Sequence, residues 1–262
     1  MDLHQPAQTE ISTRIVLVGG LDPGTGAGVS RDLLTATALS AHGEVVGTAW
    51  TEQGSHSACT IEPRAPERVG AALESALARV GASGNGVKIG MVATSATTQA
   101  IESVLRSYAG PIVYDPVLRT SSGYPLYDGD RSSILALARR ATLLTPNLGE
   151  AAWLLDRPVQ SESDARRAAR DLRAFGIAAV LVKGGHLEGD ATDVLLSPAG
   201  ESIFSSPRIP GPSPRGTGCA LATAIAVGLA RGEPLEHAVA SAKTWLGRHI
   251  ANARAVGDEW HL

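Results

Sequence analysis

A thiol stands where a helix is expected to begin, directly behind three residues with almost no side chains. In the segment "PRGTGCALATAIAVG", residues 214–228, Gly216, Thr217 and Gly218 precede Cys219 and an apolar run with helical spacing. A helix N-terminus presents unpaired backbone N–H groups and a partial positive charge, and glycines let an anion reach those donors. The triplet therefore predicts an oxyanion or phosphate cradle. A tight turn that needs glycine for backbone reasons alone is the alternative.

Cys219 lies within the field of the same helix end. Helix N-termini lower the pKa of thiols, so this position favours a partly ionised thiolate at neutral pH. Such a group takes a proton from an alcohol or polarises it. The alternative is a small buried apolar side chain, and this is the reading we give to Cys59, the other cysteine, which has no comparable surroundings.

Apolar runs with β-branched residues alternate with helical patterns along most of the chain. Strands are expected at 14–20, 44–50, 86–92, 111–117, 141–147 and 178–185, and a hairpin over 192–206 around Pro198–Gly200. Helices are expected at 28–41, 66–81, 95–108, from 148, from about 161, at 216–230 and at about 234–254. The first of these helices is predicted to gather Val29, Leu33, Leu34 and Leu39 on one broad face.

This alternation predicts an α/β fold with a mostly parallel sheet covered by helices on both faces. The hairpin would add an antiparallel edge. No break in composition, repeat or linker is visible, so residues 13–262 are expected to form one domain behind a flexible tail at 1–12.

Ligands in open α/β sheets bind outside the carboxyl ends of the strands. Polar and glycine-rich segments follow nearly every expected strand, and we expect them to meet at one edge. They are "GGLDPGTGAG" (19–28), "TEQGS" (51–55), "GM" (90–91), "DPVLRTSSG" (115–123), "TPNLGE" (145–150), "KGGH" (183–186) and "PRGTGC" (214–219).

Charged and amide side chains at these strand ends suit phosphate and metal binding. Lys183 could reach a phosphate as a point charge, or be a solvated lysine. Asn147 and Glu150 have the spacing of a helix N-cap and its capping box; the functional alternative is that Glu150 orients water around Mg²⁺. Asp115, at another strand end, could assist at the same metal, because Mg²⁺ usually takes few carboxylates and keeps several waters.

The first glycine-rich loop does not fit a known phosphate motif. It lacks the GKS or GKT ending of a P-loop, and in "GTGAGV" the third glycine comes one residue too early for a dinucleotide fingerprint. Asp22 in this loop is a candidate hydrogen-bond acceptor for a small substrate.

Bulk properties exclude several classes of function. The net charge of −3 predicts no binding to nucleic acid or to acidic membranes. Two cysteines make a disulfide scaffold implausible and favour a reducing, cytoplasmic compartment. The polar N-terminal residues lack the apolar centre of a signal peptide, and no apolar run reaches the ~20 residues of a membrane span.

Several blocks together carry a family resemblance: "GGLDPGTGAGVSRDL", "VKIGM", "DPVLRTSSGYPLYD", "LLTPNLGEA", "VLVKGGHLEGD" and "RGTGCALATAIAVGLARG". In this order, from about residue 14 to 250, the chain resembles the hydroxymethylpyrimidine and phosphomethylpyrimidine kinases of thiamin synthesis, within the ribokinase-like superfamily. The resemblance implies a three-layer αβα sandwich, ATP with Mg²⁺, phosphorylation of a pyrimidine hydroxymethyl group and then of its monophosphate, and a homodimer.

The resemblance also implies roles for residues. Gly216, Thr217, Gly218 and Cys219 would form the anion hole, with Cys219 near the reacting oxygen and Lys183 on the ATP phosphates. Asn147 and Glu150 correspond to the metal and phosphate element of the family. The positions that would line the pyrimidine pocket are Asp22, Ala27, Gln53, Met91 and Val117.

The chain departs from the family pattern close to the substrate. Arg215 precedes GTGC where the family usually has His, and Arg brings a permanent charge that could grip phosphate. The first loop differs at Gly24, Thr25, Ser30 and Arg31, the second at Glu52 and Gly54, and the C-terminal "GDEWHL" is shorter than usual.

Three other functions fit parts of the pattern. A pyridoxal kinase of the same branch is the nearest, although the loop "LRTSSGYPLYDG" has no cysteine, which some of those enzymes carry there. A nucleotide-dependent oxidoreductase is disfavoured by the spacing of the first glycine loop. A non-catalytic pyrimidine sensor is disfavoured by the presence of Lys183, Glu150 and Cys219.

Overall fold

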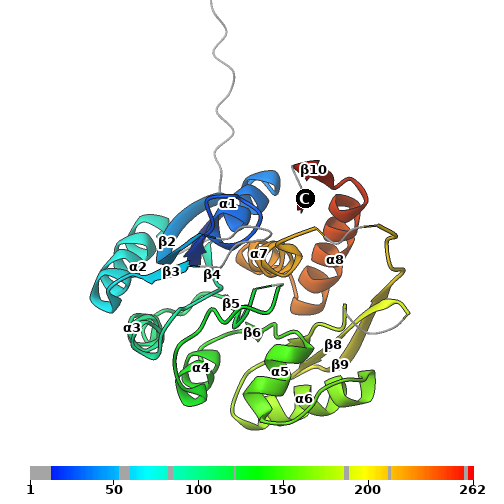
Figure 1. The fold of residues 1–262 in the computed structure, drawn as a ribbon. Helices are drawn as coiled ribbons and strands as arrows, with labels where there is room; N and C mark the ends of the chain where they lie inside the picture. The colour runs from blue at the N-terminus through cyan, green and yellow to red at the C-terminus, as the bar shows by residue number, and fades with distance from the viewer. Residues whose placement is uncertain are drawn as a thin grey trace, which may run out of the picture.

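One nine-stranded sheet runs through the computed structural model of the chain (Figure 1). The structure describes residues 13–52, 60–81, 85–120, 122–185, 189–211, 214–256 and 259–262. The tail predicted at 1–12 lies outside these residues.

The centre of the sheet is parallel and both of its edges are antiparallel. The strand order is β3-β2-β1-β4-β5-β6-β7-β8-β9. The parallel strands are β2 (His42–Glu52), β1 (Arg14–Leu21), β4 (Asn85–Ile89), β5 (Ile112–Tyr114), β6 (Leu143–Leu144) and β7 (Val180–Val182). The antiparallel strands are β3 (Thr60–Pro63) at one edge and the predicted hairpin β8 (Ala191–Ser197) and β9 (Gly200–Ser206) at the other.

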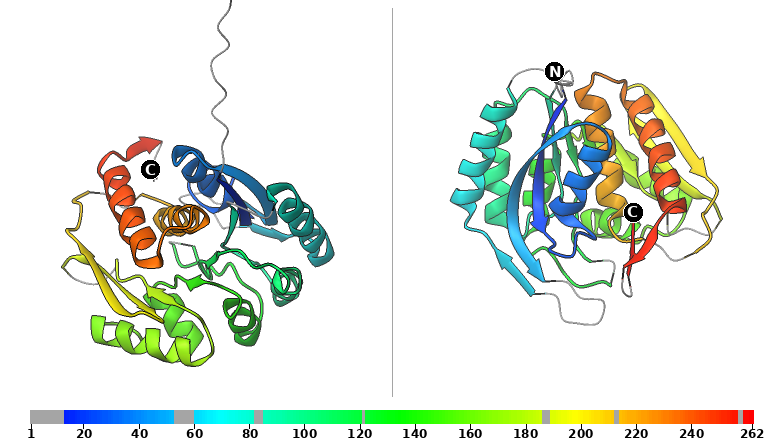
Figure 2. Two further views of the ribbon diagram at one scale, coloured as in Figure 1. Left: turned by 180° about the vertical axis from the view of Figure 1, so that it is seen from behind. Right: turned by 90° about the horizontal axis from the view of Figure 1, so that it is seen from above.

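Helices cover both faces of the sheet, which confirms the three-layer αβα sandwich (Figures 1 and 2). One face carries α1 (Gly28–Ala38), α7 (Thr217–Ala230) and α8 (Leu235–Ala251). The other carries α2 (Pro66–Val80), α3 (Ser95–Leu105), α4 (Arg131–Ala138), α5 (Leu148–Leu155) and α6 (Glu162–Ala174). No helix in the described ranges is long and apolar enough to cross a membrane.

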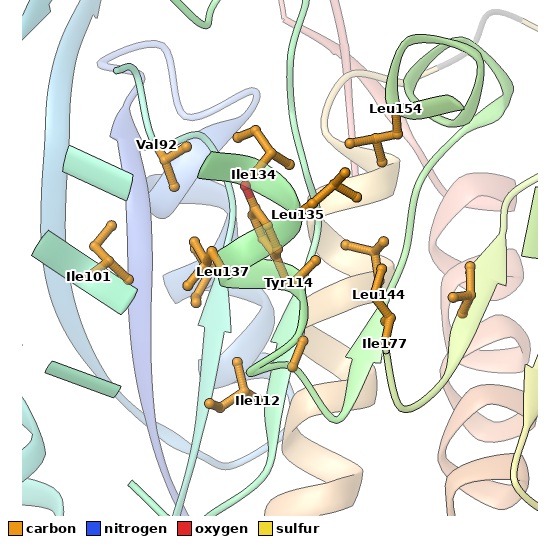
Figure 3. Close-up of a cluster of buried hydrophobic side chains, with 14 of the residues drawn as sticks. Val92, Ile101, Ile112, Tyr114, Ile134, Leu135, Leu137, Leu144, Leu154 and Ile177 are labelled. Atoms are coloured by element: carbon orange, nitrogen blue, oxygen red, sulfur yellow. The ribbon is translucent and has the colours of Figure 1, made fainter. Parts of the chain in front are cut away.

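The pleat of the central strands divides the core between the two faces. In β1, Val16 and Val18 belong to the cluster under α2 to α6, whereas Ile15 and Leu17 face α1 and α7. Figure 3 shows part of the larger cluster, in which Tyr114 of β5 lies among aliphatic side chains of several helices. A strand buried on both faces needs apolar residues at every position, which is why these strands read as continuous apolar runs.

The prediction for the apolar face of α1 is confirmed for Val29 and Leu39, which pack in the core, and is wrong for Leu33 and Leu34. Leu33 and Leu34 are 38% and 49% exposed, whereas Arg31 and Asp32 on the same helix are buried. Apolar spacing misleads here because Asp32 finds a charged partner inside the protein, as described below. The sequence analysis also missed α4, the edge strand β3 and a short hairpin of β10 (Arg254–Val256) and β11 (Glu259–His261).

Candidate active site

The N-terminus of α7 faces the carboxyl ends of the central strands, as predicted. Gly216 is its N-cap, with φ +74, and Thr217 to Cys219 form the first turn. A Cβ on Gly216 would collide with the backbone oxygen of Gly26, so only glycine lets the two loops approach this closely. Gly216, Thr217 and Gly218 are partly exposed, and the first N–H groups of a helix have no partner within it. The arrangement is an accessible cradle for an anion.

Lys183 lies directly beneath this cradle. Its Nζ is 2.5 Å from Oδ1 of Asp115, and a Cβ on Gly218 would lie 3.2 Å from the same Nζ and 3.7 Å from Oδ2 of Asp115. The absence of a side chain at 218 therefore leaves an ammonium and a carboxylate facing the helix end. Lys183 and Asp115 were each predicted as site residues at different strand ends. They form one charged pair at the predicted cradle.

Glu150 is held beside this pair by the predicted capping box. Asn147 N donates to Glu150 Oε2 at 2.7 Å, and Glu150 N donates to Asn147 Oδ1 at 2.9 Å. The Lys183 N–H donates to the carbonyl of Pro146 at 2.8 Å, which ties the start of α5 to the end of β7. Burial raises the pKa of Glu150 to about 7; Lys183 opposes this shift and Asp115 adds to it. The capping box is confirmed, and it places the carboxyl group of Glu150 near the ammonium group of Lys183.

The expected thiolate at Cys219 is not supported by its surroundings. The residue is 8% exposed, and burial raises the pKa of the thiol to about 11, with the positive charge of Lys88 offsetting only part of the shift. The backbone N–H of Gly28 donates to the sulfur. Desolvation of the charged form outweighs the field of the helix, so the thiol is protonated at neutral pH.

A buried ion pair behind the cradle was not anticipated from the sequence. Lys88 Nζ lies 2.6 Å from Asp32 Oδ2, and Thr223 Oγ1 donates to Asp32 Oδ1 at 2.9 Å. All three residues are inaccessible to solvent. Burial is the largest single influence and lowers the pKa of Lys88, but the negative groups around it, Asp32 first among them, together outweigh burial, so the pKa of Lys88 is raised. A lysine in an otherwise apolar strand, "GVKIG", was the available signal.

The candidate substrate residues lie on the neighbouring strand ends. Met91 and Val117 belong to one small apolar cluster with Leu126 and Ala49. Gln53 lies outside the described residues.

Asp22 is occupied within its own loop. It is 1% exposed, and its carboxylate accepts N–H groups from Gly24 at 3.0 Å and Ala27 at 3.1 Å. Arg215 Nη2 also lies 3.3 Å from Oδ2. In the structure Asp22 therefore shapes the loop that carries Ala27.

A second polar pair missed by the sequence analysis holds the loop after Lys183. Asp193 Oδ1 accepts from the N–H of Gly184 at 2.9 Å, and its Oδ2 lies 2.6 Å from Lys243 Nζ on α8. The residues on both sides of the cradle are thus fixed by buried charges.

A helix N-terminus, a lysine and two carboxyl groups at the carboxyl edge of the sheet are the arrangement expected of an enzyme that transfers a phosphoryl group to a small molecule. The model of the phosphomethylpyrimidine kinase family matches residues 22–261. The chain therefore belongs to this family, which confirms the resemblance seen in the sequence, and it is a kinase that uses ATP.

Curated relatives agree. The hydroxymethylpyrimidine/phosphomethylpyrimidine kinase of Streptomyces coelicolor is 38% identical over 237 residues, 88% of this chain and 86% of that protein. The thiamine biosynthesis bifunctional protein of Geobacter sulfurreducens is 38% identical over 247 residues, 93% of this chain, and the chain spans only 50% of its length. Among solved structures, the pyridoxal kinase of Staphylococcus aureus in complex with AMP-PCP superposes with a TM-score of 0.86 at 26% identity, over 95% of this chain and 92% of that one.

Proposed function

We propose that this kinase phosphorylates the hydroxymethyl group of 4-amino-5-hydroxymethyl-2-methylpyrimidine, and then the monophosphate, as a step of thiamin biosynthesis. One observation carries the proposal: Lys183, Asp115, Glu150 and the first turn of α7 converge at the carboxyl edge of the sheet. The names of the relatives described above give the substrate.

In the proposed mechanism the protein positions the groups and stabilises charge, because phosphoryl transfer asks for little covalent chemistry from the enzyme. The N–H groups of Thr217, Gly218 and Cys219 would receive the negative charge of the transferring group, and Lys183 would hold the ATP phosphates. The protonated thiol of Cys219 would donate a hydrogen bond to the acceptor group and would not act as a general base.

We infer that Mg²⁺ accompanies ATP. Asp115 and Glu150 supply hard oxygen ligands beside the cradle, and Asp115 Oδ2 faces the open side of Gly218. No group of three or more His, Cys, Asp or Glu side chains suited to a metal occurs in the described part of the chain. Two carboxylates and substrate phosphates match the usual Mg²⁺ site, in which waters complete the coordination. Asp115 and Glu150 would hold the ion, which would supply positive charge to offset the charge that develops on the transferring group.

A homodimer in the cytoplasm completes the proposal. Support comes from the family resemblance and from exposed apolar side chains on the adjacent elements α1 and β2, namely Leu33, Leu34, Val45 and Trp50. Light scattering coupled to size exclusion would test the dimer, with Leu34→Asp as the disruptive variant and a monomeric wild type as the contrary result.

Mass spectrometry of products tests the activity. The purified protein receives Mg-ATP with the hydroxymethylpyrimidine, with its monophosphate, or with pyridoxal. Phosphorylation in the pyrimidine series supports the proposal. Phosphorylation of pyridoxal alone would favour the second candidate, a pyridoxal kinase. The structural similarity to the Staphylococcus aureus enzyme supports this alternative. ATP left intact with all three would favour a binding protein.

Cys219→Ala provides the matched site variant. Removing a group that contacts the reacting oxygen should lower turnover by about 10²-fold, with the unfolding midpoint little changed. If Cys219→Ala turns over as fast as the wild type, Cys219 has no role in the reaction.

A further inference from the structure

Two of the arginines that depart from the family pattern meet at the anion cradle. Arg31 is 5% exposed, and a Cβ on Gly216 would lie only 3.0 Å from its Cγ, so its side chain packs against the N-cap of α7. Its Nη1 donates to the carbonyl of Leu262 at 3.0 Å, whereas its buried Nε has no hydrogen-bond partner. A buried guanidinium N–H without a partner is costly, and at this place it points to a ligand that supplies the acceptor.

Arg215 is fixed on the same side of the cradle. Its Nη2 lies 3.3 Å from Asp22 Oδ2, and a Cβ on Gly26 would lie 3.3 Å from its Nη1. Its backbone N–H donates to the carbonyl of Trp260 at 3.0 Å. The guanidinium is therefore held between the first glycine loop and the first turn of α7.

Carboxylates and guanidinium groups lie close together at this corner. Asp22 and Asp32 both favour the charged form of Arg31. Asp22 already faces Arg215, and Asp32 is paired with Lys88. Burial lowers the pKa of Arg31, although an arginine stays protonated at any physiological pH. An anion bound between the two guanidinium groups would receive charge-assisted hydrogen bonds, for which arginine is the preferred partner of phosphate.

We propose that Arg31 and Arg215 form a subsite for the phosphate of an acceptor that already carries one, so that this kinase prefers the phosphate monoester to the free alcohol. The inference rests on the proposed function and names residues that set its specificity. Lys183 lies under the cradle and serves the ATP phosphates, whereas the two arginines lie on the side of the first glycine loop, which carries the acceptor residue Ala27.

The chemistry of a phosphate acceptor suits this corner. An oxygen of the acceptor phosphate attacks the γ-phosphorus of ATP and forms the new P–O bond. The bond between that phosphorus and the oxygen bridging to the β-phosphate breaks, and ADP leaves with the electron pair. A phosphate monoester has its second pKa near ~6, so it attacks as a dianion and has no proton to lose. A protonated Cys219 is therefore no obstacle to this step.

The selectivity ratio tests the proposal. It is kcat/KM for the monophosphate divided by kcat/KM for the hydroxymethylpyrimidine, measured with Mg-ATP. Arg215→Gln and Arg31→Gln should each lower the ratio by about tenfold or more, because one charge-assisted contact is lost only with the charged acceptor. Arg68→Gln on α2, an equal loss of charge at an exposed site on the opposite face of the sheet, should leave the ratio unchanged. Arg31→Lys should restore part of it.

Parallel losses for both acceptors in the two Gln variants would overturn the subsite and leave the arginines a purely structural role. If Arg31→Gln fails to fold, the less buried Arg215 decides the question. A second measurement separates the subsite from the proposed function. The affinity of the ADP-bound protein for inorganic phosphate is measured by titration calorimetry. If the wild-type protein phosphorylates neither pyrimidine, the proposed function fails. Weaker binding of phosphate to Arg215→Gln than to the wild type would still support the subsite. Equal binding to both proteins would overturn it.

Discussion

Replacing Lys88 by methionine should cost this protein a large part of its stability. Both side chains of the Lys88–Asp32 pair are removed from water, at 1% and 0% exposure, and their charged atoms are 2.6 Å apart. Lys88→Met leaves the Asp32 carboxylate buried with only the hydroxyl of Thr223 as partner. Breaking a buried ion pair in this way costs about 3–5 kcal/mol, against a total of about 5–15 kcal/mol for a typical domain.

Urea unfolding followed by circular dichroism measures this cost. Arg106→Gln is the control, because Arg106 pairs with Glu102 on the surface of α3 and is 64% exposed; solvent screens this pair, so its loss should change the free energy of unfolding little. The triple variant Lys88→Met, Asp32→Leu, Thr223→Val replaces all buried polar groups by apolar ones, and should recover most of the loss.

The sign of the pH dependence follows from the raised pKa of Lys88. A cation with a raised pKa contributes its full stabilisation below its unfolded value, 10.5, and loses it only as the pH rises through the folded value. The contribution of Lys88 itself is therefore constant from about pH 6 to about pH 9, and the deficit of Lys88→Met should grow with pH wherever Asp32, whose pKa burial raises, ionises in the variant. A loss below about 1 kcal/mol, or a triple variant as unstable as the single one, would refute the reasoning.

Three further outcomes follow from the site. Because the pKa of Cys219 is raised to about 11, its alkylation by iodoacetamide in the nucleotide-free protein should be slow at neutral pH and accelerate as the pH rises. Peptide mass spectrometry measures this rate. Fast labelling that does not depend on pH would mean that Cys219 is a thiolate. Gly216→Ala should destabilise by about 1–3 kcal/mol more than Gly232→Ala in urea unfolding, since both have positive φ but only the first would meet backbone. Lys183→Met should raise KM for ATP at least about tenfold in steady-state assays, and an unchanged KM would place the ATP phosphates elsewhere.

The general plan of the fold was predictable because it depends on local patterns. Continuous apolar strands alternating with helices indicate a parallel sheet, and its carboxyl edge then determines where polar loops meet. This is why Lys183, Asp115 and Glu150, chosen from three separate strand ends, lie together with the start of α7. The capping box was equally visible, since it needs only two residues at fixed spacing.

The failures concern residues whose surroundings come from distant parts of the chain. Asp32 is buried because Lys88 and Thr223 reach it from another strand and another helix, and helical periodicity cannot show this. For Cys219, the helix field was readable from the sequence but the extent of burial was not, and burial dominates the pKa of the thiol.

The corner that holds Arg31 and Arg215 also has a consequence for the timing of folding. The Arg31–Leu262 hydrogen bond joins residues 231 positions apart, and the Arg215–Asp22 pair joins residues 193 apart. Contacts between residues so far apart in the sequence form late, because the entropy cost of closing a long loop comes before the contact can stabilise the fold. During synthesis the first glycine loop would emerge from the ribosome long before the residues that complete its charge environment. This corner is thus assembled only when the two ends of the described chain have met, so the proposed binding of a phosphorylated acceptor would require the fully assembled fold.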